Sequence, residues 1–120
     1  MVWDVRFTDE FGSWFAEIDE AAQNDTQVLI RLLEDMGPQL PFPHSSGLEG
    51  SQHSHMRELR IQSKGRPIRV FYAFDPVRSA ILLIGGNKTG DKRFYDIFIP
   101  IADKLYDEHI ADLKRKGEIK

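Results

Sequence analysis

Apolar and polar residues alternate at the start of the chain, over residues 2–7. Trp3, Val5 and Phe7 fall on one face, and charged residues separate them, which is typical of a half-buried strand. Directly after this segment the spacing of apolar residues changes from two to three or four, so a helix is expected next.

Two amphipathic helices are predicted between Thr8 and Gly37. Threonine favours the N-cap position, and apolar side chains recur at helical spacing from there to Ile18. The second helix is expected from about Asp25, after a short break. It ends at Gly37-Pro38, because glycine accepts the left-handed C-terminal conformation and proline cannot continue a helix. Together the two segments predict a helical hairpin.

Three strands with short connections are predicted over residues 56–62, 67–75 and 79–84. The first two alternate between two faces, whereas the third is apolar throughout and is typical of a central strand. Gly85-Gly86 suits a bend at the end of the third strand. Connections of hairpin length make the three strands antiparallel neighbours.

Pro100 suits the first turn of a last helix, whose apolar face continues to Leu113. The order of elements is then β-α-α-β-β-β-α. This order predicts an α+β domain in which the helical hairpin covers one face of an antiparallel sheet and a C-terminal helix follows. Residues 37–55 are irregular, with three prolines and three glycines. Loops of this length are often functional, although a packed surface connection fits at least as well.

The composition agrees with one globular domain over residues 1–120. The hydrophobic fraction is 41%, which is enough for a buried core. The chain has no cysteine, so disulfides, thiolate metal sites and a cysteine nucleophile are excluded. No secretory signal is visible and the longest apolar run is far too short to span a membrane. A soluble cytoplasmic protein without a membrane partner is therefore expected.

Charge is distributed unevenly along the chain. Residues 57–93 contain nine Lys/Arg and three Asp/Glu, whereas residues 1–56 contain two and ten. The formal net charge of −3 thus hides a basic segment in an acidic chain. A localised positive field is typical of an anion-binding surface, and RNA is the first candidate.

The expected open face of the sheet, which points away from the hairpin, carries Glu58, Arg60 and Arg69 side by side. Arginine side chains bind phosphate oxygens bidentately, so this array suits a phosphodiester. Aromatic residues near it suit stacking on unpaired bases, which favours single-stranded RNA over duplex DNA. Candidate RNA contacts, basic and aromatic, are Arg57, Lys64, Arg66, Phe71, Lys92 and Phe94.

Cleavage of RNA through its 2′-hydroxyl requires a base, cations that stabilise the developing charge, and an acid for the leaving oxygen. Arg60, Arg69 and Arg93 suit the cationic role. Glu58 fits a general base, and it fits equally well an ion-pair partner that orients the arginines. The residue types alone leave both roles open.

Other residues are also candidates for proton transfer. Lys88 or Lys92 serves as a base only where neighbouring cations favour its neutral form. Tyr95 fits two roles, since it suits a residue that orients the 2′-hydroxyl and equally a general acid or base. His53 and His55 precede the basic strand, but two histidines at this spacing in an irregular loop are weak metal ligands. They are more often surface residues, and neither a metal nor another cofactor is expected.

Several motifs follow one another along the chain, namely Trp3 to Phe15, Gly37-Pro38, Arg57-Glu58-Leu59-Arg60, Ile68-Arg69-Val70-Phe71-Tyr72, Gly86 to Tyr95 and Ile99 to Tyr106. In this order they resemble the HigB-type toxins of the RelE/ParE superfamily, which belong to type II toxin–antitoxin systems. The resemblance runs over nearly the whole chain.

The resemblance implies a RelE-like fold and a metal-free, ribosome-dependent mRNA endonuclease that inhibits translation. It implies a helix-turn-helix antitoxin, HigA-like, as partner, mRNA in the ribosomal A site as substrate, and DNA contact only through the antitoxin complex. The site residues it implies are Glu58, Arg60, Arg69, Lys88, Lys92, Arg93 and Tyr95. Members of the superfamily are often basic overall, whereas this chain is acidic, which fits a nuclease that takes its substrate from the ribosome.

Two other functions fit the same pattern. A ParE-like inhibitor of DNA gyrase has the same fold without a nuclease site. A catalytically inactive module that only binds the antitoxin is the other alternative.

Overall fold

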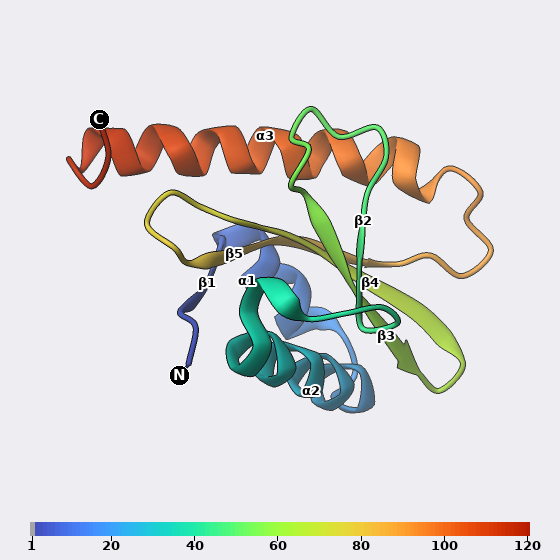
Figure 1. Cartoon of the computed structure of the whole chain (residues 1–120). Coiled ribbons are helices and arrows are strands. Elements are labelled where there is room, and N and C mark those ends of the chain that lie inside the picture. The colour runs from blue at the N-terminus through green and yellow to red at the C-terminus, as the bar shows by residue number, and fades with distance from the viewer. Residues whose placement is uncertain (1) are drawn as a thin grey trace.

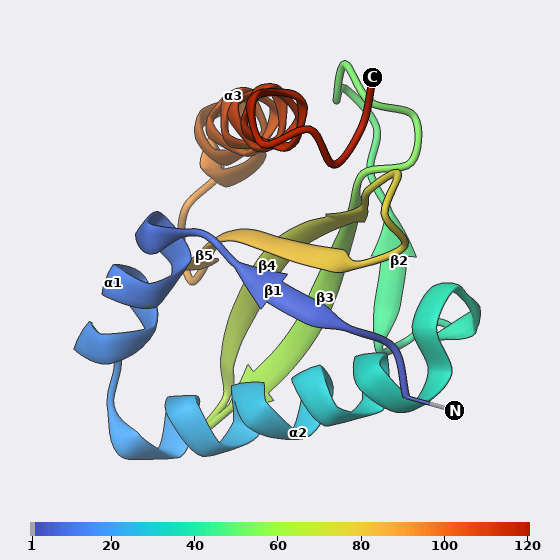
Figure 2. The same ribbon diagram turned by 90° about the vertical axis from the view of Figure 1, so that its left-hand side faces the viewer.

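The alternating segments form a five-stranded sheet that lies between two helical layers, as the computed structural model of residues 2–120 shows (Figures 1 and 2). The helical hairpin covers one face of the sheet and the C-terminal helix crosses the other. The elements in chain order are β1 (Val5–Phe7), α1 (Asp9–Glu17), α2 (Glu20–Met36), the 3-10 helix η1 (Gly37–Gln39), β2 (Ser45–Gly47), β3 (Arg57–Ser63), β4 (Arg66–Phe74), β5 (Ala80–Asn87) and α3 (Phe94–Arg115).

The strand order in the sheet is β1-β5-β4-β3-β2. The three long strands are antiparallel neighbours, which confirms the expectation, and β5 lies inside the sheet between β1 and β4. The short strand β1 pairs with β5 in parallel, so the sheet is mixed. Strand β2 was not predicted, because Ser45-Ser46-Gly47 has no apolar alternation to mark it.

The hairpin begins and ends at the residues that cap its helices. The Thr8 hydroxyl accepts a hydrogen bond from the amide of Phe11 at 3.0 Å, as expected of an N-cap. The Asp19 carboxylate accepts one from the amide of Ala22 at 2.9 Å, so α2 begins at Glu20, earlier than predicted. At the other end α2 stops at Gly37, as predicted, with φ 58° and ψ −135°, a positive-φ conformation that favours glycine but is not the left-handed helical one that was expected.

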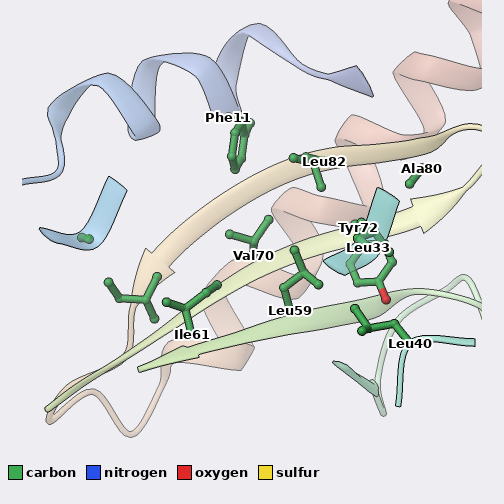
Figure 3. Close-up of a cluster of buried hydrophobic side chains, with 11 residues drawn as sticks. Phe11, Leu33, Leu40, Leu59, Ile61, Val70, Tyr72, Ala80 and Leu82 are labelled. Carbon is green, nitrogen blue, oxygen red and sulfur yellow. The ribbon is translucent and has the colours of Figure 1, made fainter. Parts of the chain in front are cut away.

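A first core lies between the hairpin and the sheet (Figure 3). Alternate residues of the long strands point into it and meet apolar side chains of the helices, which confirms the predicted inner face. Its buried members are Phe11, Ala22, Leu33, Leu40, Leu59, Ile61, Ile68, Val70, Tyr72, Ala80 and Leu82.

A second core lies on the other face of the sheet, beneath α3. The expectation of an open face is therefore wrong over the middle of the sheet. Helix α3 begins at Phe94, and Pro100 lies inside it, so the prediction that Pro100 marks the first turn is wrong as well. The reason is that Phe94 and Ile99 are buried in the second core, where Phe94 stacks on Phe71, so the apolar face of the helix begins ahead of the proline.

Gly85 and Gly86 lie within β5 and do not form the expected bend. Both are buried, Gly85 against an aromatic ring of the hairpin and Gly86 against aromatic rings of α3. A Cβ atom on Gly85 would overlap the Trp14 ring from the hairpin, and one on Gly86 would lie 2.8 Å from Phe94 and Phe98 of α3. The two glycines therefore let both helical layers approach the same strand.

None of the helices in the described part of the chain is both long and apolar enough to cross a membrane.

Gly85→Ala should destabilise the fold by about 1–3 kcal/mol, because the added methyl group must displace the Trp14 ring from a packed core. Urea unfolding followed by circular dichroism measures the change. Gly47→Ala is the matched control, since the nearest atom to its new Cβ is 3.7 Å away, and its stability should stay within about 0.5 kcal/mol of the original. Equal stabilities of the two variants would contradict this account of β5.

Candidate functional site

The carboxylate of Glu58 lies at the centre of a polar cluster on β3. Its side chain is nearly inaccessible, with 4% of the residue surface exposed. The Tyr95 hydroxyl donates a hydrogen bond to Oε1 at 2.7 Å, and the Ser46 hydroxyl donates one to Oε2 at 2.9 Å. A guanidinium nitrogen of Arg60 and one of Arg69 each lie 3.5 Å from the carboxylate. Groups from β2, β3, β4 and α3 thus converge on one side chain.

The sheet register explains most of this convergence. Glu58 and Arg60 are two residues apart and share a face, and Arg60 pairs across the ladder with Arg69. Ser46 is the partner of Glu58 on β2. Only Tyr95 comes from outside the sheet, in the first turn of α3, which the second core holds over this face.

Arg69 is the most unusual member of the cluster, because its charge is buried and only partly paired. It is 4% exposed, and one of its terminal nitrogens donates to the carbonyl of Ile68 at 3.1 Å. Among residues 2–120 its Nε atom has no hydrogen-bond acceptor, and its contact with Glu58 is too long for a good hydrogen bond. A buried donor without a partner is costly, so this guanidinium suits an added anion.

Arg69 lines a pocket of about 380 Å³ together with Arg60. The pocket lies at the edge of β3 beyond the end of β2, where the carbonyl of His44 accepts a hydrogen bond from the amide of Arg60 at 2.9 Å. Its lining residues are Leu29, Pro43, His44, Arg60, Gln62 and Arg69. Two cations therefore share one small cavity, which favours binding of a phosphate group.

Tyr95 is placed to donate a proton or hold one. Burial raises the pKa of its phenol above the ordinary value near 10, and the hydrogen bond to Glu58 acts in the same direction, whereas the charge of Arg69 opposes both. The phenol is therefore protonated at neutral pH. Lys88 lies with its Nζ atom 5.4 Å from the centre of the Tyr95 ring, which places this predicted residue beside the cluster.

The structure separates several predicted RNA contacts from this cluster. Arg57 donates to the hydroxyl of Ser45, in the layer of the first core, and Arg66 pairs with Asp19 at 3.0 Å beside the N-terminus of α2. Lys64 is exposed in the turn between β3 and β4.

The loop before α3 carries two more predicted cations. Lys92 and Arg93 are exposed there, immediately before the turn that holds Tyr95. Their role in the site stays a prediction.

The prediction that Phe71 and Phe94 stack on bases does not agree with the structure. Both are buried in the second core, where their ring centres are 5.9 Å apart. A sheet covered on both faces was not expected, and it turns these aromatic residues into core residues.

The two histidines predicted as possible site residues lie elsewhere. A ring nitrogen of His53 is 2.8 Å from the carboxylate of Asp107, and one of His55 is 3.1 Å from the hydroxyl of Tyr106. Tyr106 is three helical turns beyond Tyr95 on α3, about 16 Å along the axis. These histidines fasten the loop to α3 and do not join the polar cluster.

Sequence reasoning missed three residues of the 37–55 loop that belong to this region. Ser46 hydrogen bonds to Glu58, His44 lines the pocket, and Phe42 lies beside Arg60 with 5.2 Å between its ring centre and the guanidinium carbon. The length of the loop was the one available signal, because the contacts themselves depend on the path of the chain in space.

Comparisons with known proteins agree with this fold. The model of a family described as phage derived protein Gp49-like (DUF891) matches residues 13–107. A candidate toxin named HigB3 of Mycobacterium tuberculosis is 42% identical over 99 residues, which cover 82% of this chain and 85% of the relative. Another named HigB2, of the same organism, is 37% identical over 108 residues, which cover 88% of this chain and 54% of the relative. The chain thus spans about half the length of HigB2.

Two solved structures have the same fold at low sequence identity. A mutant of the Escherichia coli toxin RelE in the free state superposes with a TM-score of 0.58 at 9% identity, over 78% of this chain and 92% of RelE. The RelBE2 toxin–antitoxin complex of M. tuberculosis gives a TM-score of 0.52 at 16% identity, over 72% of this chain and 99% of the matched chain.

The fold is therefore the α+β fold of RelE. The chain belongs to the Gp49-like family, and within it to the HigB type.

Glu58→Ala should destabilise the protein by about 3–5 kcal/mol, because it leaves the buried Arg69 guanidinium without its carboxylate. The double variant Glu58→Leu/Arg69→Met removes both charges and should recover most of this loss. Urea unfolding measures both changes. Asp112→Ala removes only exposed ion pairs and should leave the unfolding midpoint close to the original. A double variant less stable than Glu58→Ala would contradict the prediction.

Tyr95→Phe should make stability less sensitive to alkaline pH. The folded state holds the phenolic proton more tightly than the unfolded chain, so this contribution is complete below about pH 10 and is lost as the pH rises above it. Urea unfolding over a series of alkaline pH values measures the slope. Burial also raises the pKa of Tyr106, so adding Tyr106→Phe should flatten the curve further. Identical slopes for the original protein and Tyr95→Phe would rule out this linkage.

Proposed function

We propose that this chain is the toxin of a type II toxin–antitoxin pair and inhibits translation by cleaving mRNA in the ribosomal A site. The proposed activity is that of an endoribonuclease which uses side chains alone, without a metal or other cofactor. The buried, incompletely paired Arg69 beside Arg60 is the observation that carries the proposal. It is a site prepared for a phosphate, on a fold shared with named toxins.

In the proposed reaction the 2′-hydroxyl oxygen of one nucleotide attacks the adjacent phosphorus. A new P–O2′ bond forms, the P–O5′ bond breaks, and the products are a cyclic phosphate and a free 5′-hydroxyl. Arg60 and Arg69 hold the phosphate and stabilise the negative charge that develops on it. Glu58 positions both guanidinium groups through its central location between them.

Proton transfer in this scheme belongs to Glu58 and Tyr95. The proton of the 2′-hydroxyl passes to the Glu58 carboxylate, and the Tyr95 phenol, which is protonated at neutral pH, donates one to the leaving oxygen. The hydrogen bond between the two residues then allows the proton on Glu58 to return to Tyr95 and restore both.

The proposed partners follow from the same assignment. A helix-turn-helix antitoxin of the HigA type would neutralise the toxin, and contact with DNA would occur only through that antitoxin. Substrate delivery by the ribosome in the cytoplasm suits a chain with a formal net charge of −3, because its overall field does not favour capture of free RNA.

Inducible expression of the chain alone in a bacterium, with primer extension on abundant transcripts within minutes, tests the proposal. New 5′ ends inside translated regions, lost when translation is blocked, are the expected result. Arg60→Gln should reduce cleavage about a hundredfold, since a donor to the developing charge is lost while the partly exposed position tolerates the change. Arg31→Gln, on an exposed part of α2, is the matched control and should cleave normally.

Growth arrest with intact mRNA and relaxed plasmid DNA would instead indicate inhibition of gyrase. Harmless expression of a folded protein would indicate a module that only binds the antitoxin. Cleavage by Arg60→Gln at the original rate would mean that the protein is a nuclease but that its active site is not this cluster.

A further inference from the structure

An exposed aromatic ring stands beside the arginine pair, on the segment that leads into β2. Phe42 is 68% exposed, and the Arg60 guanidinium carbon lies 5.2 Å from the centre of its ring. The guanidinium covers one face of the ring and leaves the other free for a second planar group. Single exposed aromatic side chains are common on protein surfaces, so what distinguishes Phe42 is its contact with the arginine pair.

Phe42 also adjoins the pocket that contains Arg69. The next two residues, Pro43 and His44, line this pocket together with Arg60 and Arg69. The nearly buried Arg69, whose Nε has no acceptor within residues 2–120, lines the cavity. The two arginines that line the pocket therefore lie beside an aromatic ring just outside its lining, which contacts Arg60.

We propose that Phe42 and His44 form a nucleobase subsite, in which one unpaired base stacks on the free face of Phe42 while its phosphate binds Arg60 and Arg69. This inference rests on the proposed function, because it names the part of the RNA that the same pocket takes. Arg60 contacts the ring and lines the cavity, so it links the base and the phosphate of a single nucleotide.

The chemistry of the pocket favours a nucleotide over a simple anion or an apolar peptide. A phosphate alone would use the arginines but would leave Phe42 in water. An apolar segment would cover Phe42 but would leave the buried charge of Arg69 unmet. His44 and Gln62 add side chains that donate and accept hydrogen bonds at the edge of a bound base.

This subsite replaces the stacking residues that the sequence suggested. Phe71 and Phe94 are buried, whereas Phe42 is one of two strongly exposed phenylalanines among residues 2–120. The other, Phe7, is 64% exposed on β1 and packs beside Phe11, on the hairpin side of the sheet. Phe7 is therefore a matched control for loss of an exposed aromatic ring.

Binding of adenosine 5′-monophosphate and of ribose 5-phosphate, followed by NMR on isotope-labelled protein, tests the subsite. The original protein should bind the nucleotide about tenfold more tightly than the sugar phosphate, a factor equivalent to about 1.4 kcal/mol of stacking. Phe42→Ala should abolish this preference, and Phe42→Tyr should keep it because the planar ring remains. Phe7→Ala should keep it as well.

Equal binding of the two ligands by the original protein would overturn the subsite, and so would a tenfold preference that persists in Phe42→Ala. The translation-dependent cleavage assay separates this outcome from failure of the proposed function. If the original protein cleaves mRNA but shows no base preference that depends on Phe42, the proposed nuclease function stands and the nucleobase subsite is rejected. If the base preference depends on Phe42 but the protein cleaves no mRNA, the nucleobase subsite stands and the proposed nuclease function is rejected.

Discussion

The contact between Glu58 and Arg69 is the interaction on which the rest of the site depends. Both side chains are 5% exposed, and transfer of two charges out of water costs several kcal/mol per ion. The carboxylate is compensated by hydroxyl donors from Tyr95 and Ser46, so the first turn of α3 and the short strand β2 are both held to it. The guanidinium is compensated only in part. The Arg69 guanidinium, which lines a cavity, therefore has too few negatively charged partners within the described residues.

The second helical layer is what makes this arrangement possible. If α3 lay elsewhere, Glu58 and Arg69 would be ordinary ion-pair partners on a wet face of the sheet, where such pairs contribute little. Packing of Phe94 and Ile99 over the sheet removes that water and brings Tyr95 to the carboxylate. The burial that stabilises the protein is therefore also the cause of the electrostatics of the site.

Much of the fold could be predicted from local patterns, because alternation and capping act over a few residues. The inner face of the long strands and the caps at Thr8 and Gly37 are of this kind. The start of α3 was predicted too late, because Pro100 was taken as the first turn although aromatic residues from Phe94 onward already belong to the helix. In the site, the register made Glu58, Arg60 and Arg69 neighbours, and the sequence pattern already indicated this. The positions of Phe42, His44 and Ser46 depend on how a long loop crosses the edge of the sheet, which no periodicity describes.

The parallel pairing of β1 with β5 joins residues near the start of the chain to residues beyond position 79. Tyr95 comes later still, so the polar cluster needs segments from β2, β3, β4 and α3 together. During synthesis from the N-terminus the cluster cannot be completed until the first turn of α3 has been made, because Tyr95 supplies one of its hydrogen bonds. Glu58 and Arg69 are therefore synthesised before the tyrosine hydroxyl that compensates the buried carboxylate is available.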